Sequence, residues 1–391
     1  MRLSQRVSST GESATLKVAN LARELRARGE SVIDLSVGQP DFDSPQVAVE
    51  AAQRALADGR TRYTANGGIL ELRRALAEDY RRRHGAPWSG DDVQVTVGAK
   101  MALYELAQAL VNPGDKVVLP SPYWVSLPEQ IRLAGGEPVV VASDPEDGFQ
   151  LRAAPLLEAI DERTRAVLVN SPCNPTGGVM PKAELERLVA GCADAGIPLI
   201  ADETYERFFF DGDPVSSAAL AERYPETVVL VGSFSKSYAM TGWRLGYVFA
   251  PPPLLKALGS LQSHATSNPT SFAMWGAVEA LERGEEELQQ RLQAFRERRD
   301  ALVPLLGTVP GWSCAPPHGA FYAFPKIEGC YRPGLESSAA VAEHLIRSEA
   351  VAVVPGSAFG REGHVRLSFA CSLEELKEGV TRIIRALEPA G

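Results

Sequence analysis

The chain has 391 residues, of which 45% are hydrophobic and 23% are charged, the ordinary balance of a globular protein with about two domains. Its net charge of -9, from 40 basic and 49 acidic residues, argues against nucleic acid as the main partner. No apolar stretch is long enough to cross a bilayer, and the five cysteines lack CxxC spacing. We therefore expect no membrane partner, no metal site, and reduced thiols in the cytoplasm.

The predicted elements alternate between helices and strands along most of the chain. Helical spacing of apolar residues predicts helices at 14–28, 46–58, 69–83, 182–195 and 285–305. Short apolar runs predict strands at 32–35, 93–97, 116–119, 138–141, 166–170, 198–201 and 227–231. Most of these runs are continuously apolar, which is typical of strands buried on both faces. The pattern predicts an α/β fold with a central, mostly parallel sheet flanked by helices.

The densest basic run is Arg81-Arg82-Arg83, at the end of the predicted helix 69–83. Cations are favourable at a helix C-terminus, so a solvated helix end explains the run better than a binding patch.

Polar residues stand directly after the predicted strands of the sheet. In open α/β sheets this carboxyl edge is where ligands bind. The residues concerned are Gly98, Ala99, Lys100, Trp124, Asn174, Asp202, Tyr205, Ser233, Ser235 and Lys236.

The segment 233–246 contains the most informative of these residues. It places Lys236 among small hydroxylic residues, with Arg244 eight positions later. A lysine becomes a good nucleophile where its charged form is disfavoured, and hydroxyls with a guanidinium suit a dianionic phosphate. This combination predicts a Schiff-base lysine with a phosphate clamp, the protein's half of a pyridoxal-phosphate site. The alternative is a solvated lysine in a surface loop.

Three further residues have the chemistry to tune such a cofactor. An ionised Asp202 facing the pyridine nitrogen would keep that nitrogen protonated, which makes the ring an electron sink. The Asn174 amide and the Tyr205 hydroxyl are candidate donors to the phenolic oxygen of the ring. Taken alone, Asp202 also fits a helix N-cap, and Asn174 fits a turn-forming Asn-Pro pair.

A phosphate needs several donors. Gly98, Ala99 and Lys100 open a helix predicted to start near Met101, so backbone N–H groups and the helix dipole would point at an anion. The side chains of Ser233, Ser235 and Arg244 are the other predicted donors; no GxGxxG motif indicates a dinucleotide.

From about Val7 to about Ala386 the sequence resembles the class I pyridoxal-phosphate-dependent aminotransferases of fold type I, in particular the bacterial aspartate aminotransferase subgroup. The resemblance implies that Trp124 stacks on the cofactor ring and that Gly38 and Arg366 hold the substrate carboxylate. It also implies a homodimer in which Tyr63 reaches the phosphate of the neighbouring subunit. As single residues, Arg366 and Tyr63 would be interpreted as a surface ion-pair residue and a core or interface tyrosine.

The same resemblance implies a division into two domains. A large cofactor-binding domain is expected at 46–284. A small α+β domain is expected from 1–45 together with 285–391, which contains the apolar segments 319–324, 351–354 and 365–369.

Substrate preference is the least determined property. In similar aspartate enzymes a threonine and a lysine meet the distal carboxylate, and Thr15 and Lys100 hold those positions here. However, Gly11-Glu12-Ser13 stands where the subgroup usually has Lys-Pro-Ser. The loss of this cation weakens the case for prephenate, and Glu12 makes aspartate less certain.

The sequence thus predicts an aminotransferase that moves an amino group from an L-amino acid, with aspartate the first candidate, to 2-oxoglutarate. Covalent double displacement predicts ping-pong kinetics. The alternatives are aromatic amino acids, alanine or prephenate as substrates, or a lyase or synthase that uses the same cofactor. A cofactor-sensing regulator is disfavoured because little chain remains for a DNA-binding domain.

Overall fold

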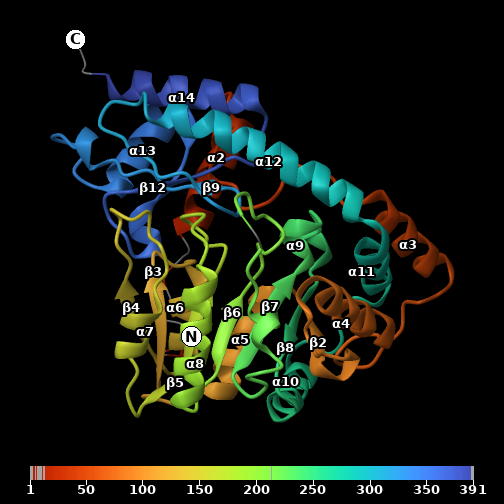
Figure 1. Ribbon diagram of the computed structural model, residues 1–391. Coiled ribbons are helices and arrows are strands. Elements are labelled where there is room, and N and C mark those ends of the chain that lie inside the picture. Colours follow the sequence, from red (N-terminus) through yellow and green to blue (C-terminus); the bar gives the residue numbers. More distant parts are fainter. Residues whose placement is uncertain (1–2, 5, 7–10, 12–13, 213, 389–391) are drawn as a thin grey trace.

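The fold was analysed in a computed structural model, which describes residues 3–4, 6, 11, 14–212 and 214–388. Its centre is a seven-stranded sheet with the strand order β2-β8-β7-β6-β5-β3-β4 (Figure 1). Strands β3 to β7 run parallel, and β8 is antiparallel to both of its neighbours. The strands are β2 (Val93–Thr96), β3 (Lys116–Ser121), β4 (Glu137–Ala142), β5 (Thr164–Asn170), β6 (Leu199–Asp202), β7 (Val228–Ser233) and β8 (Gly246–Phe249).

Helices cover both faces of this sheet. The α-helices of this part are α3 (Gln46–Ala57), α4 (Leu70–His84), α5 (Ala99–Leu110), α6 (Ser126–Leu133), α7 (Ala153–Glu158), α8 (Lys182–Asp194), α9 (Phe234–Ser237), α10 (Pro252–Ala265) and α11 (Ser271–Arg283). Short 3-10 helices are η1 (Gly90–Asp92), η2 (Ser217–Leu220) and η3 (Thr241–Trp243).

The alternation of side chains along each strand explains the continuous apolar runs. On β3, Val118 packs into a cluster with residues of α4, α8 and α11, whereas Val117 packs into a second cluster with residues of α5, α6 and α10. Val167 and Leu168 of β5 divide between the same two clusters. Both faces of the sheet are therefore buried, as the sequence predicted.

A second, separate core lies beyond the carboxyl edge of the sheet. This part of the molecule contains the strands β1 (Ile33–Asp34), β9 (Tyr322–Ala323), β10 (Val351–Ala352), β11 (Val354–Pro355) and β12 (Val365–Ser368), whose buried residues belong to this core and to two smaller apolar clusters. Its helices are α2 (Ala14–Ala27), α12 (Glu285–Leu306), α13 (Ser338–Glu349) and α14 (Leu373–Leu387), with η4 (Glu328–Cys330) and η5 (Gly356–Phe359). The long α12 extends from α11, beside the sheet, to α14 (Figure 1).

Most sequence-based elements are confirmed, with ends that move by a few residues. Three predictions need correction. The sequence did not reveal β8, and α5 begins at Ala99 rather than near Met101. Arg83 is not part of a solvated helix end, because only 17% of its side chain is exposed, compared with 51% for Arg81 and 58% for Arg82. Among the described residues, no helix is long and apolar enough to span a membrane.

Candidate active site

The polar residues predicted after the strands come together at one edge of the sheet. Strand β2 is parallel to β7, because both are antiparallel to β8 between them. Gly246 of β8 accordingly pairs with Thr96 on one side and with Ser233 on the other. The carboxyl ends of β2, β5, β6 and β7 therefore meet, and with them the loops that carry Gly98, Asn174, Asp202 and Lys236.

Lys236 lies on α9, directly after β7, and its amine donates a hydrogen bond to the Gly38 carbonyl. Burial lowers the pKa of Lys236 to about 8, and the charges of Arg366, Arg244 and Lys100 act in the same direction, against Asp202. A larger fraction of the amine is therefore neutral near physiological pH than in a solvated lysine. This is the property that a nucleophilic lysine needs.

Asp202 ends β6 and is only 4% exposed. The Thr204 hydroxyl and backbone N–H donate to its Oδ1 at 2.6 and 3.2 Å. Burial raises the pKa of Asp202 to about 6, while these hydrogen bonds and the Lys236 charge oppose the shift. A buried carboxyl with so few charged partners is suited to a cationic ring nitrogen.

Asn174 joins the predicted substrate arginine to the predicted cofactor tyrosine. Its Oδ1 accepts a hydrogen bond from Arg366 Nη1 at 3.0 Å, and its Nδ2 donates to the Tyr205 hydroxyl at 3.4 Å. Arg366 Nη2 donates to the Ser36 carbonyl at 2.6 Å, but its buried Nε has no hydrogen-bond partner. Arg366 forms no ion pair with the described residues, which leaves its charge available for a substrate carboxylate.

Tyr322 completes this chain of contacts and was missed by the sequence analysis. Its hydroxyl lies 2.9 Å from the Tyr205 hydroxyl, and its ring lies 4.5 Å below the Arg366 guanidinium. A Cβ atom on Gly38 would lie 3.4 Å from the same hydroxyl. The signal in the sequence was the run 319–324, which we interpreted only as part of the small unit.

The predicted phosphate cradle is formed by backbone and by Arg244. Gly98 has a φ of +79°, and a Cβ at this position would lie 2.6 Å from Arg244 Nη2. A Cβ on Gly246 would overlap the Ala99 backbone. The chain therefore brings the N-terminus of α5 and a guanidinium into direct proximity, which only glycine permits. The Ser233 hydroxyl accepts from the Ser235 N–H at 3.0 Å and so caps α9.

Lys100 and Trp124 also lie together. The Lys100 amine is 4.8 Å from the centre of the Trp124 ring. Although the residue is exposed, partial desolvation of the Lys100 amine lowers its pKa, and the charge of Arg244 adds to the effect.

Tyr63 is not brought into the site within one chain, since its side chain is 90% exposed. Thr15 lies in α2. Glu12 and Ser13 lie outside the described residues.

Comparisons with known proteins agree with this geometry. The chain matches the family described as aminotransferase class I and II over residues 30–383. It is 44% identical over 389 residues to the probable aspartate/prephenate aminotransferase of Aquifex aeolicus (strain VF5), covering 99% of this chain and 98% of that protein. It is 42% identical over 390 residues to the aspartate aminotransferase of Bacillus subtilis (strain 168), covering 99% of both. The structure of aspartate aminotransferase from Thermus thermophilus with maleate has a TM-score of 0.94 at 42% identity, covering 99% of this chain and 100% of that one.

The fold and the site define a fold type I enzyme that uses pyridoxal phosphate. The chain belongs to the class I and II aminotransferases, and it is a transaminase.

The residues present fit this cofactor. The glycine cradle at Gly98 with Arg244 suits a phosphate, and the buried Asp202 suits a ring nitrogen. The cofactor supplies an aldehyde for a lysine amine and a ring that accepts an electron pair from the substrate.

Proposed function

We propose that the protein transfers the amino group of a dicarboxylic L-amino acid, with aspartate the first candidate, to 2-oxoglutarate. The observation that carries the transfer from an amino acid is Arg366, which is 3% exposed, faces Asn174 and Tyr322 and has an unpartnered Nε. A planar guanidinium in such a position suits the bidentate binding of a carboxylate.

The other residues of the site have separate roles in this proposal. Lys236 would bind the cofactor, and its Nζ would accept the proton from the substrate Cα and hold it for its return. Asp202 would hold the ring nitrogen in its protonated form, and Tyr205 with Asn174 would hold the phenolic oxygen. Trp124 would hold the ring through its indole face, and Ser233, Ser235, Arg244 and the Gly98–Lys100 backbone would hold the phosphate.

Initial-rate kinetics test the reaction type. Parallel lines in double-reciprocal plots for the amino donor and 2-oxoglutarate would support the double displacement, whereas intersecting lines would count against it. A screen of amino acids against 2-oxoglutarate tests the donor.

Lys100 and Thr15 are the proposed contacts for the distal carboxylate. The cation at Lys100 supports this role, as does the Thermus thermophilus relative, whose structure contains maleate, a dicarboxylate. Lys100→Ala should lower kcat/KM about tenfold more for aspartate than for alanine, since a lost charge-assisted hydrogen bond costs about 1.5 to 3 kcal/mol. The matched control is the exposed Lys182→Ala. Equal losses for both substrates would remove Lys100 from the specificity of the enzyme.

We also propose that the active unit is a homodimer in which Tyr63 reaches the phosphate of the neighbouring site. The 90% exposure of this tyrosine supports the proposal, because a large aromatic side chain is seldom left in solvent without a partner. Mixing a Lys236→Ala subunit with a Tyr63→Ala subunit should restore one intact site per heterodimer. Activity that stays at the level of the separate variants would contradict the exchange of Tyr63.

The proposal includes two domains, at 46–284 and at 1–45 with 285–391, which the separate cores support. Phe208 and Phe210 of the larger part pack into the second core, so the two domains meet there. The cytoplasm is the proposed compartment, in keeping with five free thiols.

A further inference from the structure

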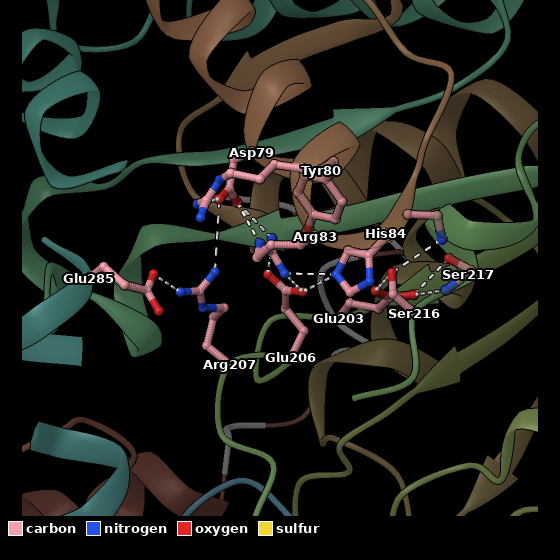
Figure 2. A network of polar contacts seen from close by, with 12 residues as sticks. Asp79, Tyr80, Arg83, His84, Glu203, Glu206, Arg207, Ser216, Ser217 and Glu285 are labelled. Carbon is pink, nitrogen blue, oxygen red and sulfur yellow. Dashed lines mark hydrogen bonds and ion pairs between the residues drawn. The ribbon is translucent and has the colours of Figure 1, made fainter. Parts of the chain in front are cut away.

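The turn that follows β6 has two chemically different faces. Asp202 and Tyr205 point into the active site, where they meet the groups described above. Glu203 and Glu206, one residue further along in each case, point to the opposite side. Four residues at the end of β6 and in the turn after it therefore connect the reacting centre to a second set of polar groups, and Figure 2 shows this second set.

Glu206 is held by Arg83 of helix α4. The two carboxylate oxygens accept hydrogen bonds from Arg83 Nη1 and Nη2 at 2.7 and 2.8 Å (Figure 2). Only 7% of the Glu206 side chain is exposed. Burial acts to raise the pKa of Glu206, but Arg83 and His84 outweigh it and hold the pKa well below its usual range. The carboxylate is ionised, and its orientation is fixed by a two-pronged contact.

Arg83 is itself held in place. Its Nε donates to Asp79 Oδ2 at 2.8 Å, one turn earlier on α4, and its guanidinium lies 4.7 Å from the centre of the Tyr80 ring. Asp79 is 6% exposed. The side of the guanidinium that faces away from Glu206 is thus held by neighbours on α4 itself, which ties the position of Glu206 to that helix.

Glu203 forms a second anchor on the same face. Its Oε1 accepts from the Ser217 N–H and hydroxyl at 2.7 and 2.6 Å, and its Oε2 accepts from the Ser216 hydroxyl at 2.6 Å. Arg207, the next residue after Glu206, forms ion pairs with Asp79 and with Glu285 at the start of α12. The turn is therefore fastened to α4, to η2 and to α12.

These contacts matter for chemistry because the opposite face of the turn needs accurate placement. A catalytic group displaced by about 1 Å can lose about 100-fold in rate. Buried ion pairs add little net stability, since desolvation offsets most of their attraction, but they fix geometry well. The buried, two-pronged pair of Arg83 and Glu206 is thus better explained by the need to position Tyr205 than by a gain in the stability of the fold.

We propose that Glu206 and Arg83 are positioning residues for the aminotransferase reaction: their paired contact holds the turn so that Tyr205 and Asp202 face the cofactor in the reactive geometry. This inference rests on the proposed roles of Tyr205 and Asp202. The pair touches neither substrate nor cofactor and acts only through the turn.

The test compares Arg83→Gln and Glu206→Gln with Arg81→Gln on the same helix. Arg81 pairs with Glu78 and lies away from the turn, which makes it a matched control. The readouts are the pH midpoint of the visible band of the bound cofactor, measured without substrate, the kcat and KM values, and the thermal midpoint.

Weaker donation from Tyr205 should raise the pH midpoint of the band by about half a unit or more in both variants. We expect kcat to fall roughly tenfold while KM changes little, because Arg366 stays in place. Arg81→Gln should change neither quantity.

The conservative variants Arg83→Lys and Glu206→Asp keep the charge but lose the two-pronged geometry, and they decide the question if the glutamine variants do not fold. A lower thermal midpoint with an unchanged band midpoint and unchanged kcat would contradict the inference. Failure of the unmodified protein to transfer amino groups would contradict the proposed function alone, since the band midpoint needs no substrate.

Discussion

Charged side chains lie on both sides of the turn after β6, and the two groups differ in their balance. On the active-site side, the charges that act on the Lys236 amine come from three cations and a single carboxylate: Arg366, Arg244, Lys100 and Asp202. On the outer side, acids and bases alternate and are paired with one another: Asp79, Arg83, Glu206, Arg207 and Glu285.

The difference shows how one protein uses clustered charge in two ways. Cations that outnumber their acidic partners repel one another, so their presence indicates anions that arrive from outside. The phosphate and the carboxylates of the proposed substrates are such anions. Paired charges need no ligand, and they orient the chain instead.

The largest expected effect tests the active-site side of the turn, where cations outnumber carboxylates. Lys236→Ala should lower kcat on the order of 10,000-fold, because both the nucleophile and the proton carrier are lost. The exposed Lys256→Ala on α10 is the control and should retain full activity. Steady-state rates with aspartate and 2-oxoglutarate provide the measurement, and a Lys236→Ala variant within tenfold of the unmodified enzyme would contradict the site.

Asp202→Asn keeps the shape of the side chain but removes the single carboxylate from the active-site side of the turn. We expect kcat to fall about 100- to 1,000-fold, the range found when one electrostatic contact to a developing charge is removed. The same substitution at the exposed Asp58 provides the control. If Asp202→Asn kept a normal kcat as the control does, Asp202 would not be the partner of the ring nitrogen.

Arg366→Lys preserves the charge and changes the geometry. The loss of a two-pronged carboxylate contact should lower kcat/KM by roughly 10- to 100-fold, mainly through KM. The exposed Arg347→Lys on α13 is the control and should leave kcat/KM and KM unchanged. A lysine variant with normal KM for every substrate would show that Arg366 serves the fold rather than the substrate.

Glu105 of α5 sharpens the comparison, because it is a buried acid with neither a cation nor a predicted ligand. It is 1% exposed, and neither carboxylate oxygen has a hydrogen-bond partner. Burial raises the pKa of Glu105 from 4.5 to about 7. The folded state therefore holds this proton more tightly than the unfolded state, so stability falls as pH rises from about 4.5 to about 7 and then levels off.

Glu105→Gln should remove this loss of folding stability at high pH, because glutamine has no charge to bury. At pH 8 the free energy of unfolding should rise by about 1 to 3 kcal/mol, with little change at pH 4.5 and in kcat. Denaturant titrations at both pH values test this, with the exposed Glu186→Gln as control. A destabilised Glu105→Gln protein at pH 8 would indicate that the ionised carboxylate has a stabilising partner.

The sequence revealed the sheet and much of the site for the same physical reason. Strands buried on both faces must be continuously apolar, so polar residues such as Asp202 and Asn174 stand out where each strand ends. Strand β8 was missed because it is a four-residue strand that follows the lysine segment directly and runs against its neighbours.

Contacts between residues that are distant in the sequence could not be predicted from the sequence. Tyr322 meets Tyr205 across 117 positions, and Arg83 meets Glu206 across 123. An arginine at the end of a helix has the same local pattern whether it faces solvent or a buried glutamate. Only the packing of α4 against the turn distinguishes the two cases.

The central claim is that the cations Arg366, Arg244 and Lys100 surround a lysine that binds the cofactor covalently. Borohydride reduction of the protein with pyridoxal phosphate, followed by peptide mapping by mass spectrometry, tests it most directly. We predict a single stable adduct on the peptide that contains Lys236. An adduct on Lys100 or on any other lysine, with Lys236 unmodified, would contradict the claim.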